Sequence, residues 1–245
     1  MGDEKIRLQW TYEPRYFFEK KYESVYREAP IVIEPGKVVV EMDPKLYFGD
    51  TTRIELDKYI TSMFEGVKLH SFEDYTLHKL TPQRILPSGE IVSIGGLRGT
   101  ARITGRMEVK HADYVRYDDA GNVIEDTAQK RFDETIDLAE LFAGIPYPNP
   151  LVENLMASWT NAIRNPDNEF LYLWEIWEAL KDMHTFPKDK IDRFRNLVNG
   201  PYEQSRHRGE EWHSLKPATK GELEEARQIA RGFIIAHLNT LVGKS

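Results

Sequence analysis

Residues 144–150 of this chain, with the sequence Gly-Ile-Pro-Tyr-Pro-Asn-Pro, form a proline-rich stretch that separates two regions with different hydrophobic patterns. Closely spaced prolines interrupt helices and strands alike, so this stretch is typical of a connector. The region before it contains short β-branched runs, whereas the region after it has apolar residues at helical spacing. We therefore expect an α+β fold, with a strand-rich domain over residues 1–132, a connector with a short helix over residues 133–150 and an all-helical domain over residues 151–245.

The strand-rich domain shows two hairpin patterns. Residues 31–33 and 38–40 are β-branched runs joined through Pro35-Gly36, the pair expected at the centre of a type II turn. A second hairpin is expected over residues 103–124, with its turn at residues 118–122. Further strands are expected around residues 75–80 and 91–94. One helix, starting at Thr52 and ending before Gly66, interrupts the strands.

Four helical segments follow the connector, at residues 151–164, 169–183, 188–199 and 221–241. The last opens with a capping-box pattern, Thr219 and Glu222. The second places apolar residues on one face (Phe170, Trp174 and Trp177) and acidic residues on the other (Glu175, Glu178 and Asp182). These segments predict a four-helix domain in which the tryptophans belong to the core.

Composition excludes several classes of protein. The chain has no cysteine, which excludes a disulfide framework, a cysteine nucleophile and a thiolate metal site. We expect a cytoplasmic protein without membrane contact, because no signal-peptide pattern or membrane-spanning apolar run is present. The formal net charge of −7 argues against a broad nucleic-acid-binding surface, but from Thr185 onward 11 Lys and Arg stand against 8 Asp and Glu. An anion contact is therefore expected near the C-terminus.

Arginine and histidine are concentrated between the last two helical segments, at residues 205–213 (Ser-Arg-His-Arg-Gly-Glu-Glu-Trp-His). A guanidinium group can hold two phosphate oxygens, and imidazole transfers protons near neutral pH. RNA supplies its own 2′-hydroxyl nucleophile, so this pair of groups suits metal-independent phosphodiester cleavage. No zinc, calcium or phosphate-loop motif is present, and we expect neither a metal nor another cofactor.

The four helical segments together with Arg206, His207 and His213 resemble the HEPN superfamily. The motif of that family is an arginine, often followed directly by a polar residue, with a histidine after four to six intervening residues. Arg206 and His213 fit with six intervening residues and His207 in the polar position, whereas Arg208 has Gly209 there. Some members carry a tyrosine two residues after the histidine as a modification site, but this chain has Leu215.

The resemblance implies an endoribonuclease that acts as a homodimer, of the kind that serves as a toxin or an antiviral defence effector. Arg206 would stabilise the phosphate, His213 would transfer a proton, and His207 would orient or assist. Glu178 is a weaker candidate for a supporting acidic residue. The strand-rich domain would sense a trigger or regulate the nuclease, with a regulatory protein as a further partner.

Two other interpretations remain open. In one, the helical domain is a non-catalytic module that binds a nucleotide, a nucleic-acid end or a protein, and the cluster only holds phosphate. In the other, the chain docks a protein partner through surfaces rich in Trp and Tyr, with the basic cluster as a polar rim. A solvated or capping segment is the non-functional interpretation of residues 205–213.

Overall fold

The computed structural model describes residues 3–49, 51–94, 113–118, 120–146, 148–205 and 215–243. The chain divides into two compact units. Unit 1 comprises Met1–Ser62 and Tyr75–Asp137, and unit 2 comprises Met63–Asp74 and Leu138–Ser245. Helices α2 (Thr52–Ser71) and α3 (Thr127–Ala143) each begin in unit 1 and end in unit 2. No helix in the described ranges is both long enough and apolar enough to cross a membrane.

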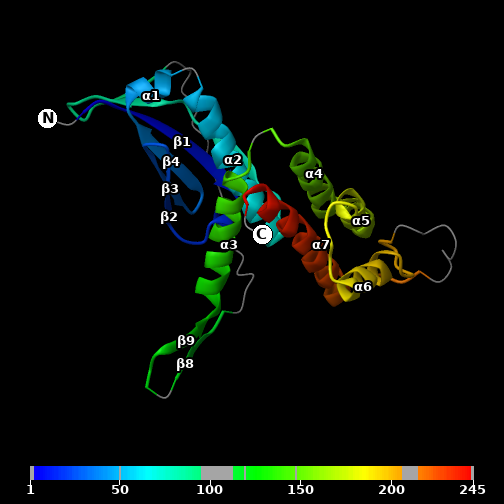
Figure 1. The fold of residues 1–245 in the computed structure, drawn as a ribbon. Coiled ribbons are helices and arrows are strands. Elements are labelled where there is room, and N and C mark those ends of the chain that lie inside the picture. The colour runs from blue at the N-terminus through cyan, green and yellow to red at the C-terminus, as the bar shows by residue number, and fades with distance from the viewer. Residues whose placement is uncertain are drawn as a thin grey trace. The chain divides into compact units, whose positions relative to one another are not determined.

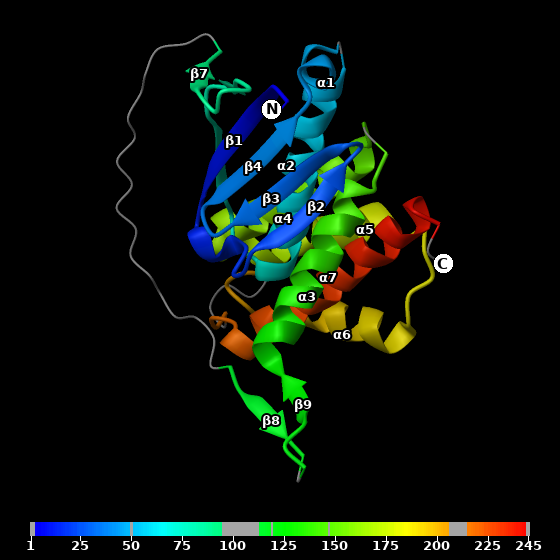
Figure 2. The ribbon, with the colours of Figure 1, turned by 90° about the vertical axis from the view of Figure 1, so that its left-hand side faces the viewer.

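Unit 1 is built on an antiparallel sheet in the order β2-β3-β4-β1-β6-β7, with β5 also pairing with β1. Strands β1 to β4 lie side by side in Figure 2. Their bounds are β1 Lys5–Glu13, β2 Tyr22–Tyr26, β3 Ala29–Glu34 and β4 Lys37–Met42, followed by β5 Thr76–Lys79, β6 Gln83–Ile85 and β7 Ile91–Ser93. The α+β class expected from the sequence is therefore confirmed.

The hairpin expected at Pro35-Gly36 is confirmed. Glu34 pairs with Lys37 across a two-residue turn, and Gly36 has a φ of +84°, which favours glycine. Strand β1 was not expected, although every second residue of it is buried. Leu8 pairs with Val40, which pairs with Ile31, so three buried aliphatic side chains form a row across neighbouring strands.

The helices of unit 1 differ from the expectation of a single helix. A short helix, α1 (Pro44–Phe48), precedes α2, and the side chain of Asp43 caps it by accepting from the Lys45 backbone N–H. A 3-10 turn also spans Arg15–Phe17. Within the second expected hairpin, β8 (Val115–Tyr117) pairs with β9 (Val123–Asp126), while residues 103–112 lie outside the described residues.

The predicted end of α2 before Gly66 was wrong. The helix continues to Ser71, and Gly66 packs against the backbone of α3 near Leu138. Glycine at this position allows a close approach of two helices rather than ending one. Helix α3 also begins earlier than residue 133, at Thr127.

Unit 2 contains the four helices expected from the sequence, visible in Figure 1 as α4 (Pro150–Arg164), α5 (Glu169–Leu180), α6 (Lys188–Val198) and α7 (Lys220–Leu241). Asn149 caps α4, with its side chain accepting from Val152, and a 3-10 turn (Pro166–Asn168) leads into α5. The two tryptophans of α5 are buried in the core of this unit, as predicted. The core also includes Trp159, whose indole N–H donates to the Lys68 carbonyl at 3.2 Å.

A buried ion pair joins α5 to α7. The guanidinium of Arg227 donates two hydrogen bonds, of 2.7 and 2.8 Å, to the carboxylate of Glu169, whose side chain is only 1% exposed. The same guanidinium lies 4.0 Å from the centre of the Phe72 ring. Burial raises the pKa of Glu169, while its bonds to Arg227 oppose that rise. The pair therefore fixes the start of α5 against the middle of α7.

Candidate functional site

The three residues singled out by the sequence, Arg206, His207 and His213, fall within residues 206–214 and lie outside the described residues. Their neighbours on both sides are described. The chain reaches this segment from α6 through Tyr202 and Ser205, and it continues from Leu215 into α7. The flanking residues therefore define where the segment is attached.

The two flanks of segment 206–214 are hydrogen-bonded to each other. The Glu203 N–H donates to the Lys216 carbonyl at 3.0 Å, and the Lys216 N–H donates to the Pro201 carbonyl at 3.1 Å. Farther along, the Ala218 N–H donates to the Gln204 side chain at 3.0 Å. The chain consequently enters the Arg- and His-rich segment and leaves it at the same place on unit 2.

Glu222 connects these flanks to α7. Its carboxylate accepts from the Tyr202 hydroxyl at 2.5 Å and from both the backbone N–H and the hydroxyl of Thr219, at 2.8 and 2.7 Å. The capping box predicted for Thr219 and Glu222 is thereby confirmed. These donors, led by Tyr202, lower the pKa of Glu222 to about 2, so the group is ionised at neutral pH. We call Tyr202, Lys216, Thr219 and Glu222 the anchor.

The acidic face predicted for α5 is exposed. Glu178 forms an exposed ion pair with Lys181 at 2.7 Å, and Glu175 accepts a hydrogen bond from Ser158. Exposed pairs of this kind are found on many solvated helix faces. The described contacts of Glu178 are therefore those of a surface residue, and they connect it to no member of the anchor.

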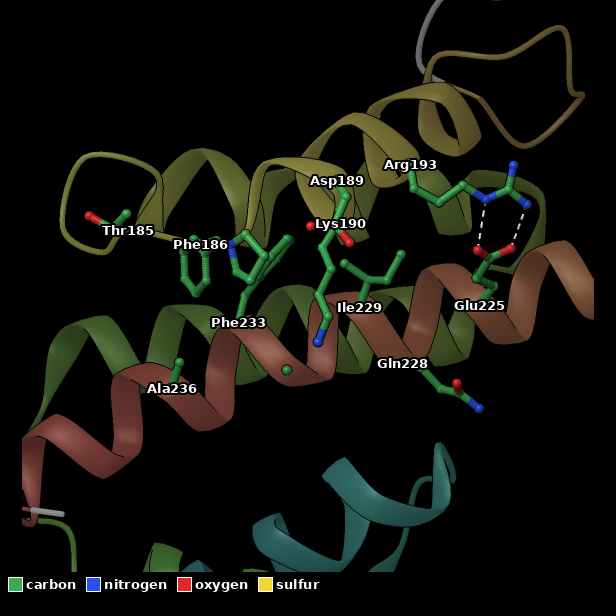
Figure 3. Close-up of a pocket in the computed structure, with 12 residues that line it drawn as sticks. Thr185, Phe186, Asp189, Lys190, Arg193, Glu225, Gln228, Ile229, Phe233 and Ala236 are labelled. Atoms are coloured by element: carbon green, nitrogen blue, oxygen red, sulfur yellow. Dashed lines mark hydrogen bonds and ion pairs between the residues drawn. The ribbon is translucent and has the colours of Figure 1, made fainter. Parts of the chain in front are cut away.

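A pocket of about 690 Å³ lies between α6 and α7. Figure 3 shows it bounded by the turn before α6, the α6 side chains and one face of α7. We call it the α6–α7 pocket. Its lining residues on the α6 side are Thr185, Phe186, Pro187, Asp189, Lys190 and Arg193, and those on α7 are Glu225, Gln228, Ile229, Gly232, Phe233 and Ala236.

One end of the α6–α7 pocket is closed by an ion pair. Arg193 donates to both carboxylate oxygens of Glu225, at 2.7 and 2.6 Å, as the dashed lines in Figure 3 show. These bonds raise the pKa of Arg193 and lower that of Glu225. The carboxylate of Glu222 also contributes to the raised pKa of Arg193, so this end of the pocket is close to the anchor.

A second cation, Lys190, enters the α6–α7 pocket from α6. Figure 3 shows its side chain running across the pocket towards α7. Lys190 forms no ion pair or hydrogen bond with another residue of the described ranges. A lysine ammonium in this state is a strongly hydrated point charge that remains available to an anion.

Aromatic rings form the other end of the α6–α7 pocket. Phe186 is half-buried, and its ring centre lies 4.5 Å from that of the buried Phe233. Behind Phe186, the Nε2 atom of His184 lies 2.9 Å from Nδ1 of His237, a residue that is 3% exposed. Burial and the nearby His184 lower the pKa of His237. The lowered pKa favours the neutral form of His237. We call the rings of Phe186 and Phe233 the apolar floor of the pocket.

Sequence patterns alone missed this pocket. Ile229 and Phe233 follow helical spacing on one face of α7, which predicts a core-facing stripe, and Phe233 does belong to the core. Whether a stripe is covered depends on the volume that the partner helix fills, which periodicity does not report. One usable signal is Gly232, because a glycine inside a helical pattern usually has a packing or functional reason.

The described ranges contain no group of three or more His, Asp or Glu side chains placed to hold a metal ion. No protein-family model, curated protein or solved structure matches the chain.

Proposed function

We propose that the chain is a metal-independent endoribonuclease of HEPN type, with Arg206, His207 and His213 as its catalytic residues. It acts as a homodimer, in the manner of toxins and antiviral defence effectors, and unit 1 senses a trigger or regulates cleavage. The support comes from the spacing of Arg206 and His213 and from the position of their segment between α6 and α7 among four helices.

The observation that carries this proposal is the hydrogen bonding between the two flanks of segment 206–214. The bond between the Glu203 N–H and the Lys216 carbonyl brings together residues that come just before Arg206 and just after His213. Catalytic groups require such support from the surrounding fold to hold their geometry. A solvated linker between two helices would not require hydrogen bonds between its flanks.

The proposed reaction is transesterification within RNA. A base removes the proton from the 2′-hydroxyl, whose oxygen attacks the adjacent phosphorus, and the bond to the 5′-oxygen of the next nucleotide breaks. An acid protonates that oxygen, giving a 2′,3′-cyclic phosphate and a 5′-hydroxyl end. His213 transfers a proton, His207 orients or assists, and Arg206 stabilises the charge that develops on the phosphate oxygens.

The test is incubation of the purified chain of 245 residues with end-labelled structured RNAs in the presence of EDTA. The wild type should leave 2′,3′-cyclic phosphate ends, and His213→Ala should slow cleavage by roughly 10²–10⁴-fold, the usual contribution of general acid–base catalysis. His78→Ala is the matched control, because His78 is an exposed histidine in β5 of unit 1. Full activity in an Arg206→Ala, His213→Ala double variant would contradict the proposal.

The α6–α7 pocket favours a second candidate, a non-catalytic module that binds a nucleotide, a nucleic-acid end or a protein. A volume of about 690 Å³ is within the range of small-molecule pockets. The pocket combines an apolar floor with Lys190, a cation that has no anionic partner within the described part of the chain. Saturable binding of an RNA that is never cleaved, in wild type and His213→Ala alike, would support this candidate instead.

A further inference from the structure

The α6–α7 pocket is formed by residues outside segment 206–214. It has aromatic rings on which a base can stack and a lysine that can contact a phosphate. We propose that it holds one nucleotide of a single-stranded part of the RNA substrate, flanking the cleaved bond. The base packs against Phe186 and Ile229, and Lys190 contacts the phosphate. This inference rests on the proposed ribonuclease function and adds a substrate-binding site to it.

The floor of the α6–α7 pocket suits a flat ring. Phe186 is half-buried and so presents part of its ring to the pocket, while the ring of Phe233 supports it from behind at 4.5 Å. A β-carbon placed on Gly232 would meet no atom within 4 Å, so the wall of α7 is open at this point. Bases of any sequence stack on aromatic rings, which is how single strands bind without base-specific readout.

The charges of the α6–α7 pocket suit a phosphate. Arg193 is engaged by Glu225, but Lys190 has no anionic partner among the described residues and extends into the space beside the floor. Asp189, the other acidic lining residue, precedes it on α6. A lysine beside an aromatic floor is the arrangement in which single-stranded nucleic acid is held by stacking and backbone charge together.

The position of the α6–α7 pocket relates it to the proposed catalytic segment. Glu225 at the end of the pocket lies on α7 three residues after Glu222 of the anchor, and Arg193 is close enough to respond to the charge of Glu222. The anchor holds the flanks of the proposed catalytic segment. If that segment binds the phosphate of the cleaved bond, a neighbouring nucleotide of the same RNA strand reaches the α6–α7 pocket.

Two pairs of variants of the chain test the inference. Gly232→Leu places a side chain in the open part of the pocket. Gly221→Leu is its control, because Gly221 lies on the same helix, also meets open space and does not line the pocket. Lys190→Gln removes the positive charge that extends into the pocket. Lys188→Gln is its control, because Lys188 is an exposed lysine at the start of the same helix that does not line the pocket. The probes are a single-stranded RNA for cleavage and its 2′-O-methyl form for binding.

We expect Gly232→Leu and Lys190→Gln each to raise the KM for RNA, and the Kd for the 2′-O-methyl strand, by about tenfold, with kcat unchanged. Lys190→Gln should also reduce the slope of log Kd against log salt by about 0.7, the value for one phosphate contact on a single strand. The two control variants should match the wild type in all three quantities.

The possible results separate the pocket from the nuclease. Cleavage by Gly232→Leu with wild-type KM and Kd overturns the pocket inference and leaves the ribonuclease proposal standing. Binding that is lost in Gly232→Leu, in a protein that never cleaves, supports the pocket and overturns the ribonuclease. Absence of both binding and cleavage in the wild type overturns both. Equally tight binding of a free mononucleotide would also overturn the inference, because the pocket would then serve a small ligand.

Discussion

Gly66 of α2 and Ala139 of α3 are packed so closely that a β-carbon at position 66 would lie 2.8 Å from the Ala139 α-carbon. The carbonyl group of Leu138 would be nearer still. All of these neighbouring atoms belong to the backbone, so they cannot move aside as a flexible side chain can. The crossing of the two helices within unit 2 therefore depends on the absence of a side chain at Gly66.

We predict that Gly66→Ala destabilises the protein by about 1–3 kcal/mol, the usual cost of overpacking, although alanine is the better helix former. Gly232→Ala is the matched control, since it also replaces a glycine inside a helix but meets open space. That control should gain up to about 1 kcal/mol. Urea unfolding of both variants tests the pair, and equal midpoints would contradict the close packing.

Several elements could be predicted because their signals are local. The Pro35-Gly36 turn and the Thr219–Glu222 capping box each lie within a few neighbouring residues, and both are present. The structural role of Gly66 could not be predicted, because it depends on its contact with α3, which lies more than 60 residues away in the sequence. Local sequence cannot distinguish a glycine that ends a helix from one that allows a second helix to approach.

Long-range pairing explains the other differences. Strand β1 has the alternating pattern of a half-buried strand, but its central place depends on β4, β5 and β6, which all pair with it. The α6–α7 pocket likewise exists because two helices leave space between them. For the proposed catalytic site, the sequence supplies the candidates Arg206, His207 and His213, and the structure describes only the residues that flank them.

The ion pair between Arg227 and Glu169 leads to a second prediction. Arg227→Met leaves a buried carboxylate without a partner, which typically costs about 3–5 kcal/mol. Arg193→Met is the matched control, because it breaks an equally well-formed pair with Glu225 that is exposed, and it should change the unfolding midpoint little. If the two variants lose similar amounts of stability, burial does not determine how much such an ion pair contributes.

The same variant should respond to pH with a defined sign. Burial already raises the pKa of Glu169, and removal of Arg227 leaves that rise unopposed. A group with a raised folded-state pKa contributes fully below its unfolded value and loses its contribution as the pH rises through the folded value. The free energy of unfolding of Arg227→Met should therefore lie closer to that of the wild type at pH 5 than at pH 7. Urea unfolding at each pH measures this difference.

A third prediction concerns His237, which is buried and lies against His184. Burial and His184 lower the pKa of His237 in the folded state, so between that value and the ordinary 6.5 the unfolded chain binds more protons. This contribution to stability is complete above pH 6.5 and declines as the pH falls below it. His237→Gln should flatten the stability profile between pH 7.5 and 5.5. His78→Gln removes an exposed imidazole and is the control, and equal slopes in wild type and His237→Gln would refute the assignment.

A final prediction links the anchor to activity. Tyr202→Phe removes the hydroxyl that donates to Glu222 but keeps the ring that packs against Phe170. If the anchor positions segment 206–214, kcat for RNA cleavage should fall several-fold while KM, which reports substrate binding, stays near the wild-type value. This loss should appear well below the unfolding temperature, where the variant is fully folded.

Tyr26→Phe provides the comparison for that experiment, because Tyr26 also donates to a glutamate, Glu55, but within unit 1. It should leave kcat unchanged. Equal kcat values in wild type, Tyr202→Phe and Tyr26→Phe would show that the bond to Glu222 does not position the catalytic segment. A matching fall in both variants would instead indicate a general effect of losing a tyrosine–glutamate hydrogen bond. Only a selective effect at Tyr202 would connect the hydrogen bond between Tyr202 and Glu222, at the start of α7, to the chemistry proposed for Arg206 and His213.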